Sequence, residues 1–368
     1  MFYSEGAADW PHLSAVVEEL ITRHDQPVTY LTSTMDDPVF EKSNDNLKAF
    51  CIGSGTMRTM LFKTINVRLF VMTLPDLETY HLKRSVFPVH YVYIYHALNS
   101  SHRAYRTGAF DNYDTVFCVG PHHEKEIRAT EKAYDLKAKN LVEHGYDRLD
   151  AIIRKRDEQP PYVASSGPAR RVLLAPSWGQ CSFIEAANIG GPLIRLLRNA
   201  GHELTLRLHP MTVRRFPKLA GKLKAEFGGE GQGSFTVGTD MDEQMSLQRS
   251  DIMISDWSGA GSEYAFGLER PVLYINTPAK VNNPEYQKID ISPLEEVIRE
   301  QIGAIIEPTA LEEAPAALER LCGQREAFLE KMRAAREEWV YNVGSSAKVG
   351  AAELMRMLKE QPLRKEIR

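Results

Sequence analysis

The sequence predicts an α/β protein of two domains, each built on a doubly wound parallel sheet. Short apolar runs alternate with helix-like stretches on both sides of a polar segment near the middle of the chain. The runs are continuously apolar rather than alternating, as in parallel strands covered on both faces. A length of 368 residues also exceeds that of one typical core.

Residues 1–158 are expected to form the first domain. Apolar runs predict its strands, and stretches opened by proline predict its helices, because proline suits the first helical turn. The expected strands are 28–31, 67–72, 89–95 and 115–119, and the expected helices are 11–23 and 121–134. Segment 156–170 is rich in Pro, Ser and Gly and is interpreted as the linker.

Residues 168–345 are expected to form the second domain, where the alternation begins again. The expected strands are 172–175, 202–208, 234–237, 251–255 and 271–275, and the expected helices are 189–200, 213–227 and 261–267. Charged segments at 311–341 and 351–359 are also expected to be helical, and residues 346–368 are set apart as a C-terminal helix.

Composition excludes several classes of protein. The net charge of -4 provides no basic field for duplex nucleic acid. No apolar run approaches the ~20 residues of a membrane span, and the first residues lack a signal-peptide pattern. The four cysteines are scattered without a C-x-x-C pair, which disfavours zinc and disulfides and predicts a reducing, cytoplasmic location.

Polar residues that follow strands are the candidate ligand-binding residues, because doubly wound sheets bind ligands beyond the carboxyl ends of their strands. His96 follows the run 89–95 and is interpreted either as a general base or as a hydrogen-bonded structural histidine. Near the linker, Gly145 permits a tight turn. Arg148 then either faces a phosphate or pairs with Asp147 or Asp150.

In the second domain, Ser177 lies in the turn after the first strand, which suits either a phosphate or a plain strand end. His209 ends another strand, and a helix is expected to begin at Pro210 or Thr212. A histidine beside a helix N-terminus can donate to a phosphate oxygen, and Thr212 is also a candidate N-cap.

The segment 254–263 joins a strand to a helix through small polar residues. Asp256, Ser258 and Gly259 are assigned to donor binding, because hydroxyls and backbone N–H groups there can approach a diphosphate. Glu263, one turn into the helix, can accept hydrogen bonds from a ribose diol. The segment is neither a Walker loop nor G-x-G-x-x-G.

Other chemistries are disfavoured. The run His122-His123-Glu124 lacks the spacing H-E-x-x-H, so neither a metal nor another cofactor is predicted. No G-x-S-x-G elbow of a serine hydrolase appears. The basic stretches 214–218 and 363–365 are interpreted as solvated faces, with contact to an anionic membrane surface as the alternative.

Taken in order, these segments resemble the CDP-glycerol glycerophosphotransferase family, which includes teichoic-acid primases and polymerases. The family pattern runs W-H-G, G-x-P-R-x-D, A-P-T-W, L-H-P and S-D-Y-S-S, with an acidic residue four positions on. The corresponding segments here are Tyr95-His96-Ala97, Gly145-Tyr146-Asp147-Arg148-Leu149-Asp150, Ala175-Pro176-Ser177-Trp178, Leu208-His209-Pro210 and Ser255-Asp256-Trp257-Ser258-Gly259 with Glu263.

The resemblance implies a GT-B architecture, in which two Rossmann-like domains face a cleft. It implies transfer of glycerol phosphate or a similar polyol phosphate from a CDP-activated donor to a hydroxyl of a glycan or lipid-linked acceptor, with release of CMP. His96 would be the base and His209 would stabilise the diphosphate. Arg148, Ser177, Ser258 and the backbone at Gly259 would line the phosphate site, and Glu263 would hold the ribose. No bound metal is implied. Cell-wall or capsule polymers and the inner face of the membrane are the implied setting.

The chain departs from the family pattern at Ala97, at Asp147 in place of proline, and at Gly259 in place of serine. A downstream lysine is absent, and Arg103 or Arg106 is its nearest substitute. A GT-B glycosyltransferase that uses a nucleotide sugar is the main alternative. A UDP-sugar 2-epimerase and a non-catalytic nucleotide-binding protein are the others.

Overall fold

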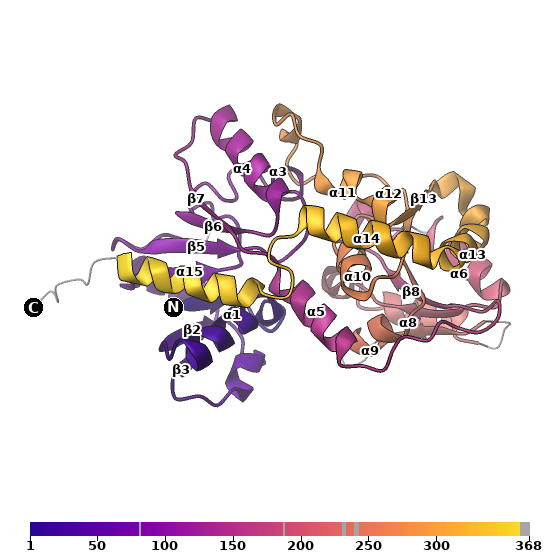
Figure 1. Cartoon of the computed structure of the whole chain (residues 1–368), viewed down its shortest axis with the longest axis horizontal. Helices are drawn as coiled ribbons and strands as arrows, with labels where there is room; N and C mark the ends of the chain where they lie inside the picture. The colour runs from indigo at the N-terminus through magenta and orange to yellow at the C-terminus, as the bar shows by residue number, and fades with distance from the viewer. Residues whose placement is uncertain (81, 187, 230–232, 239–242, 361–368) are drawn as a thin grey trace, which may run out of the picture. The chain divides into compact units, whose positions relative to one another are not determined.

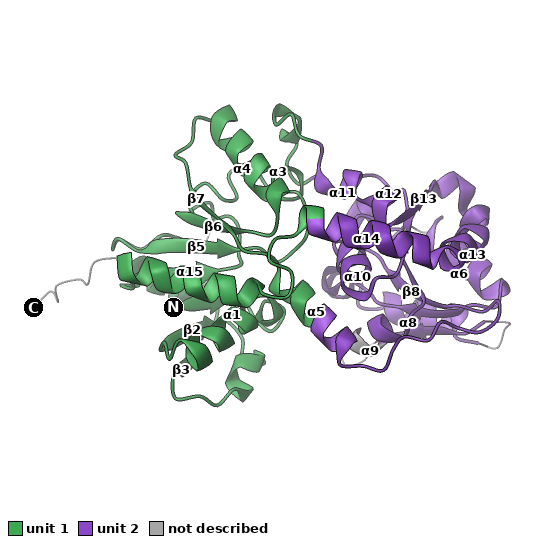
Figure 2. Ribbon diagram, in the orientation of Figure 1, with its two compact units in different colours: residues 1–151, 282–291, 338–368 green, residues 152–281, 292–337 purple. Residues whose placement is uncertain are grey.

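The computed structural model describes residues 1–80, 82–186, 188–229, 233–238 and 243–360. The chain divides into two compact units (Figure 2). Unit 1 comprises residues 1–151, 282–291 and 338–368, and unit 2 comprises residues 152–281 and 292–337. Among the described residues, no helix is both long enough and apolar enough to cross a membrane.

Unit 1 contains a parallel sheet of seven strands in the order β3-β2-β1-β4-β5-β6-β7. The order reverses at β1, which pairs with both β2 and β4, so the carboxyl ends of β1 and β4 mark the expected ligand crevice. The strands are β1 (Phe2–Ser4), β2 (Val28–Thr32), β3 (Leu47–Cys51), β4 (Leu69–Met72), β5 (His90–Ile94), β6 (Thr115–Cys118) and β7 (Asn140–Glu143).

The last helix of the chain belongs to unit 1. In Figure 1, α15 (Ser346–Glu360) runs beside α1 (Trp10–Arg23), and Leu354 and Met357 join Leu13 and Val17 in one buried cluster. The expected C-terminal helix therefore packs within the first unit; residues 361–368 lie outside the described part. The other helices are α2 (Thr56–Thr64), α3 (Ser101–Ala104) and α4 (Pro121–Ala133), with short 3-10 turns η1 (Pro38–Glu41) and η4 (Tyr286–Lys288). Helix α5 (Asp147–Asp157) begins in unit 1 and ends in unit 2.

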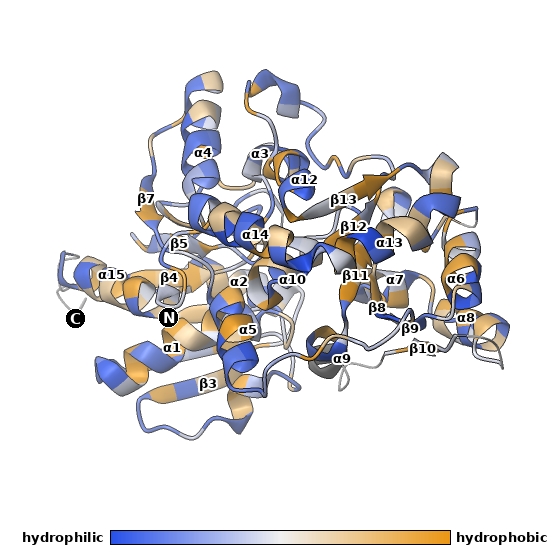
Figure 3. Cartoon of the chain, turned by 45° about the vertical axis from the view of Figure 1, so that its right-hand side comes forward, coloured by the Kyte–Doolittle hydropathy of each residue, from blue (hydrophilic) through white to orange (hydrophobic). Residues whose placement is uncertain are grey.

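Unit 2 contains a parallel sheet of six strands in the order β10-β9-β8-β11-β12-β13. Here the order reverses at β8, which pairs with β9 and β11. The strands are β8 (Arg171–Ala175), β9 (Glu203–Leu206), β10 (Phe235–Val237), β11 (Ile252–Ser255), β12 (Val272–Ile275) and β13 (Gly303–Ile306). β11 and β12 are fully buried and appear hydrophobic in Figure 3, as expected of strands covered on both faces.

The helices of unit 2 supply the rest of its core, in which Leu193 and Leu197 pack with Leu318 and Leu321. They are α6 (Gly190–Asn199), α7 (Pro210–Arg215), α8 (Leu219–Phe227), α9 (Glu243–Arg249), α10 (Ala260–Leu268), α11 (Leu294–Val297), α12 (Arg299–Ile302), α13 (Ala314–Gly323) and α14 (Arg325–Trp339), with the 3-10 turns η2 (Gly179–Cys181) and η5 (Pro308–Glu313).

The single helix expected at 213–227 is wrong. The structure has α7 and α8 instead, because Pro217 disfavours a helical conformation at Phe216, whose φ is -130° and ψ 65°. The sequence reasoning also missed α2, α5 and the strands β3, β7 and β13. β3 and β7 are edge strands with exposed positions, so they lack the continuous apolar run that marked the others.

Candidate active site

His96 lies just beyond the carboxyl end of β5, and its ring is fixed from one side. Nδ1 lies 2.9 Å from the carbonyl oxygen of Thr73, which follows β4, and 3.3 Å from the Tyr93 hydroxyl. A carbonyl oxygen can only accept, so Nδ1 carries the proton and Nε2 is the basic nitrogen. The structure thus holds His96 half-buried after β5, the strand next to the switch point, in a tautomer with a free acceptor position on Nε2, which a general base requires.

His12, which the sequence reasoning missed, lies beside His96. It comes from the first turn of α1, and its ring centre is 6.0 Å from that of His96 and 5.9 Å from that of Tyr146. Burial, reinforced by the positive charge of Arg148 and by His96, holds the pKa of His12 well below its usual value. His12 is therefore uncharged near pH 7, and its ring packs against those of His96 and Tyr146. Its only sequence signal is its place in the helix after the first strand.

The segment around Arg148 packs against His96 and His12. Gly145 has a φ of +102°, and a Cβ there would lie 2.4 Å from the Ser346 hydroxyl oxygen, so the turn requires glycine. The Tyr146 hydroxyl donates to the carbonyl oxygen of His96 at 3.0 Å. Arg148 follows in the first turn of α5, half-buried and close enough to His12 to affect its pKa.

The acidic neighbours of Arg148 have structural positions of their own. The Asp150 carboxylate accepts the backbone N–H groups of Gly344, two residues before α15, and of Ser346, the first residue of α15. Asp147 is buried, and burial raises the pKa of its carboxyl well above the usual value, with a further rise from Asp150. Asp150 thus anchors the C-terminal helix, and Asp147 favours the neutral form.

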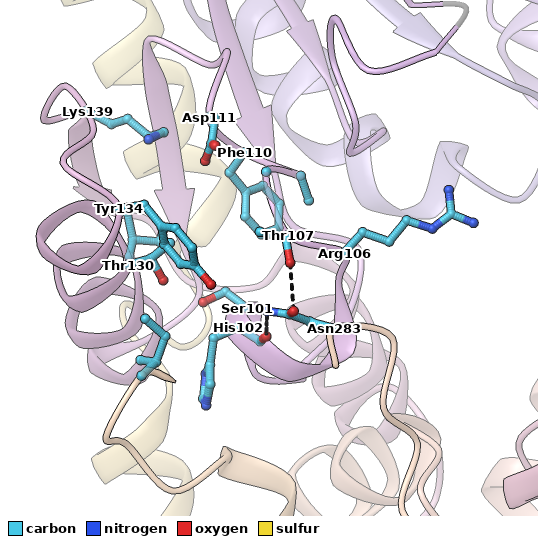
Figure 4. A pocket seen from close by; sticks show the side chains of 14 residues that line it. Ser101, His102, Arg106, Thr107, Phe110, Asp111, Thr130, Tyr134, Lys139 and Asn283 are labelled. Atoms are coloured by element: carbon cyan, nitrogen blue, oxygen red, sulfur yellow. Dashed lines mark hydrogen bonds between the residues drawn. The ribbon is translucent and has the colours of Figure 1, made fainter. Parts of the chain in front are cut away.

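Arg103 and Arg106, the nearest substitutes for the family's lysine, flank Tyr105, whose ring centre lies 5.8 Å from that of His96. Arg103 is fully buried. Arg106 lines a pocket that encloses about 440 Å³ when its open mouth is included, and there its guanidinium points away from Thr130 and Tyr134 (Figure 4). The Arg106 guanidinium carbon also lies 5.2 Å from the centre of the Tyr80 ring.

In unit 2, Ser177 follows β8 and is tied to Asp256, which follows the neighbouring strand β11. The Asp256 carboxylate accepts the backbone N–H of Ser177 at 2.8 Å and that of Phe183 at 3.1 Å. Burial raises the pKa of Asp256 to about 6, although these hydrogen bonds oppose the rise. Asp256 is 1% exposed, so the structure places it beneath the loop 177–183, as its support.

His209 is fixed in the opposite tautomer to His96. It caps α7, and its Nδ1 accepts the backbone N–H of Met211 at 3.1 Å, so the proton of the neutral ring is on Nε2. Burial lowers the pKa of His209 to about 4, helped by the charges of Lys280 and Arg207. The expected N-cap Thr212 is wrong: His209 caps the helix, and Thr212 donates to Glu185.

The indole ring of Trp178 lies beside His209, and two cations lie against that ring. The Trp178 ring centre lies 6.1 Å from that of His209, 4.8 Å from the Lys280 ammonium nitrogen and 5.8 Å from the Arg215 guanidinium carbon. Burial lowers the pKa of Lys280, against the opposing effects of Cys181, Asp256 and Glu295. This arrangement concentrates positive charge beside a neutral N–H donor, which suits a phosphate group.

Lys280 was missed because it lies in the polar loop after β12, with no motif around it. The loop is held in place by the Thr277 hydroxyl, which donates to the Cys181 carbonyl at 2.6 Å, and by the Trp257 indole N–H, which donates to the Thr277 carbonyl at 2.6 Å. Its position could have indicated it. Lys280 follows a strand of the parallel sheet, and residues after parallel strands lie at the same sheet edge, where Ser177 and His209 also lie.

The segment after β11 begins α10. The Ser258 hydroxyl oxygen accepts the N–H of Ala260 at 3.3 Å. Gly259 has φ -58°, so the turn does not need a glycine for its conformation. Gly261 is needed for packing, because a Cβ there would lie 2.6 Å from the Tyr274 hydroxyl. Glu263 is buried in the first turn of the helix.

The site residues thus gather at two sheet edges. His96, His12 and Arg148 lie in unit 1, and Ser177, His209, Ser258 and Lys280 follow strands of unit 2. Within the described ranges, no group of three or more His, Cys, Asp or Glu side chains is placed to hold a metal ion. Of the two basic stretches, 214–218 contributes Arg215 to the Trp178 ring, and 363–365 lies outside the described residues.

The chain has the GT-B fold, which it shares with several solved structures. The wall teichoic acid polymerase TagF matches with a TM-score of 0.62 and 14% identity over 98% of this chain and 89% of that one. UDP-GlcNAc 2-epimerase of Methanocaldococcus jannaschii matches at 0.55 and 12% over 98% of each chain. S. aureus MnaA, solved with UDP, matches at 0.57 and 12% over 99% and 98%.

At these identities the likeness concerns the fold. No curated protein sequence matches the chain. The family model for CDP-glycerol:poly(glycerophosphate) glycerophosphotransferase, however, matches residues 95–281, which is about half of the 368 residues. That range contains His96, Arg148, Ser177, His209, Glu263 and Lys280. The chain belongs to the CDP-glycerol:poly(glycerophosphate) glycerophosphotransferase family.

Proposed function

We propose that this protein transfers glycerol phosphate, or a similar polyol phosphate, from a CDP-activated donor to a hydroxyl of a glycan or lipid-linked acceptor. The acceptor oxygen bonds to the β-phosphorus of the donor while the bond from that phosphorus to the bridging oxygen breaks. CMP leaves with the bridging oxygen and its electron pair. The acceptor's proton passes to the base.

The observation that carries the proposal is the opposite tautomers of the two histidines. His96 presents a basic Nε2, fixed by Thr73, and His209 presents a protonated Nε2, fixed by Met211. A base for the acceptor hydroxyl and a donor for a phosphate oxygen are the two groups that the reaction needs. Because burial and nearby cations lower the pKa of His209 to about 4, its ring stays neutral and donates without titrating near pH 7.

The donor is assigned to the edge of unit 2. Lys280 and Arg215 beside Trp178 supply positive charge for the diphosphate, together with the turn at Ser177 and the segment around Ser258. Glu263 is assigned to the ribose diol. Such transfer depends on positioning and on charge neutralisation, which fixed side chains can supply. The cysteines are all free, which supports a reducing, cytoplasmic site of action.

The test is a calorimetric titration of the protein with CDP-glycerol, CDP-ribitol, CDP, UDP and a UDP-sugar. Selective binding of a CDP-alcohol, followed by CMP release when acceptor is added, is the expected result. Selective binding of the UDP-sugar would replace the proposal with the nucleotide-sugar alternative. Binding of a CDP-alcohol without turnover on any glycan or lipid-linked acceptor would support the non-catalytic alternative.

A further inference from the structure

One pocket of unit 1 lies outside the groups assigned to phosphotransfer. It is bounded by α3 and the loop 106–111, by α4, and by the segment 282–291, where the chain returns to unit 1 (Figure 4). The described residues that line it all belong to unit 1. Its volume of about 440 Å³, open mouth included, lies in the range of small-molecule sites.

Hydrogen bonds fix the walls of this pocket. The Asn283 side chain ties the segment 282–291 to α3 and to the loop after it. Its amide N–H donates to the His102 carbonyl at 2.8 Å, and its carbonyl oxygen accepts the Thr107 hydroxyl at 2.7 Å. On the side of α4, the Ser101 hydroxyl donates to Glu126 at 2.6 Å. The pocket is therefore formed before any ligand enters.

The inner lining of the pocket is apolar. It consists of four buried residues: Ala109, Phe110, Ile127 and Ile289. The Phe110 ring centre lies 4.9 Å from that of Tyr93 and 5.0 Å from that of Tyr105. Both tyrosines also contact His96. The pocket is thus distinct from the environment of His96, although the same aromatic rings support both.

The Lys139 side chain brings a buried positive charge to this pocket. Lys139 is 6% exposed, and its ion-pair partner Glu131 lies 3.7 Å from the ammonium nitrogen, beyond hydrogen-bond range. The Glu131 carboxylate already accepts the Arg128 guanidinium at 2.6 Å and the backbone N–H of Lys139 at 2.8 Å. A buried ammonium group placed in this way favours an acceptor on a ligand.

The Asp111 carboxyl supplies an acceptor facing this ammonium group. Figure 4 shows the two side chains pointing toward one another, with no hydrogen bond drawn between these two described residues. Burial raises the pKa of Asp111 and the charge of Lys139 opposes the rise, so the two groups are close enough to interact. A hydroxyl group between them can accept from Lys139 and donate to Asp111, whereas a phosphate dianion has no donor for Asp111.

Sugars and polyols have both features that this pocket matches. Their hydroxyl groups can satisfy Lys139 and Asp111 together, and their C–H groups can pack on the apolar lining and on the Tyr134 ring. We propose that this pocket is a binding site for one sugar or polyol unit, held by Asp111 and Lys139. The unit is part of a glycan chain or a free molecule, and the chemistry of recognition is the same for both.

The experiment is saturation-transfer difference NMR of the full chain with glucose, ribitol and cyclohexanol. Glucose and ribitol should bind. Cyclohexanol keeps a six-membered ring but has one hydroxyl, so its affinity should be about fivefold lower or less. Maltotriose distinguishes the two sources of the unit. Binding at least as tight as that of glucose indicates a glycan chain, and exclusion of maltotriose indicates a free molecule.

Two variants locate the binding. Asp111→Ala and Lys139→Met should each weaken the binding of glucose about fivefold or more, because each removes a hydrogen bond to a charged group. The matched controls are Asp36→Ala and Lys132→Met, which replace exposed residues of unit 1 outside the pocket lining. Both controls should bind glucose as the wild type does. Because Asp111 is exposed, its replacement tests the site even where Lys139→Met does not fold.

The proposal fails if neither glucose nor ribitol binds, if cyclohexanol binds as well as glucose, or if Asp111→Ala binds glucose as the wild type does. An equal loss in the control variants would also overturn it. So would displacement of glucose by inorganic phosphate, because the pocket would then be an anion site. The NMR signal requires neither the donor nor turnover, so failure of the proposed phosphotransfer would leave this test intact.

Discussion

The ammonium nitrogen of Lys280 lies 4.8 Å from the centre of the Trp178 indole ring. This contact joins the loop after β12 to the turn after β8, at the sheet edge where His209 presents its N–H group. An ammonium whose pKa is lowered by burial gains more from a phosphate than an exposed lysine does, because less water screens the pair.

Lys280→Met should therefore weaken the binding of CDP by about tenfold or more, a loss of about 1.4 kcal/mol. The affinity for cytidine should change little, because the nucleoside has no phosphate. The measurement is calorimetric titration with CDP and cytidine. Lys288→Met is the control, since Lys288 is an exposed lysine of unit 1 paired with Glu285. Equal weakening of CDP and cytidine would contradict a phosphate contact.

Replacement of His96 by alanine should lower kcat by about two to four orders of magnitude, in line with removal of a general base. Binding of the donor should stay within about twofold, because the donor is assigned to unit 2. CMP release in the presence of acceptor measures the first effect, and titration with CDP-glycerol measures the second. Near-normal turnover by a folded His96→Ala protein would refute the assignment.

Glu263→Gln should weaken the binding of CDP by about tenfold, a loss of about 1.4 kcal/mol, because an amide is a poorer acceptor for two ribose hydroxyls than a carboxylate. The wild type should also prefer CDP to 2′-deoxy-CDP, and the variant should lose most of that preference. Calorimetric titrations of the wild type and of Glu263→Gln with CDP and with 2′-deoxy-CDP measure the four affinities needed for this comparison. A preference that survives in Glu263→Gln would place the ribose elsewhere.

His123 should make the stability of unit 1 depend on pH. Burial lowers the pKa of His123 to about 3, although its bond to Asn99 opposes the shift. The neutral ring accepts the N–H of Val119 and donates to the Asn99 carbonyl. The unfolded histidine takes up a proton below pH ~6.5, so this contribution is present above that pH and is lost as pH falls towards 3.

For one histidine, the loss between pH 7 and pH 5 is about 2 kcal/mol. Urea unfolding of the wild type and of His123→Gln at both pH values isolates the contribution of His123 to the pH dependence of stability. The other titrating groups, including Asp256 with its raised pKa, are common to both proteins. The wild type should lose about 2 kcal/mol more than the variant over this interval. Equal losses would show that His123 is not held neutral.

Gly145→Ala should lower the free energy of unfolding by about 3 kcal/mol or more, because the new methyl meets the Ser346 hydroxyl and the Tyr341 carbonyl at 2.4 Å. Gly344→Ala is the control. Gly344 also has a positive φ, +81°, but no atom lies within 4 Å of its added Cβ. It should cost only about 1 kcal/mol of backbone strain. Urea unfolding measures the loss of stability in both variants. Equal losses would mean that backbone strain alone, without the steric clash, accounts for the effect of Gly145→Ala.

Much of the fold was predictable because the signals were local. The buried strands β11 and β12 appear in the sequence as continuous apolar runs, since both faces are covered, and α1 and α4 open with a proline at the first turn. The positions of His96, Ser177 and His209 also followed from the sequence. Each comes directly after such a run, and parallel strands bring their carboxyl ends to one edge.

The tertiary structure decided what those residues do. The tautomer of His96 depends on the carbonyl of Thr73, 23 residues earlier in the chain. Asp256 accepts the backbone N–H of Ser177, which lies 79 residues earlier in the chain. Such contacts depend on which strands are neighbours, and local periodicity carries no record of strand order. The same reason hid Lys280 and His12, whose neighbours come from other strands and helices. The sequence by itself determined most of the buried strands and the sheet edges where the site lies, because those signals are local. Only packing across the sheets determined the edge strands and which groups meet at the site.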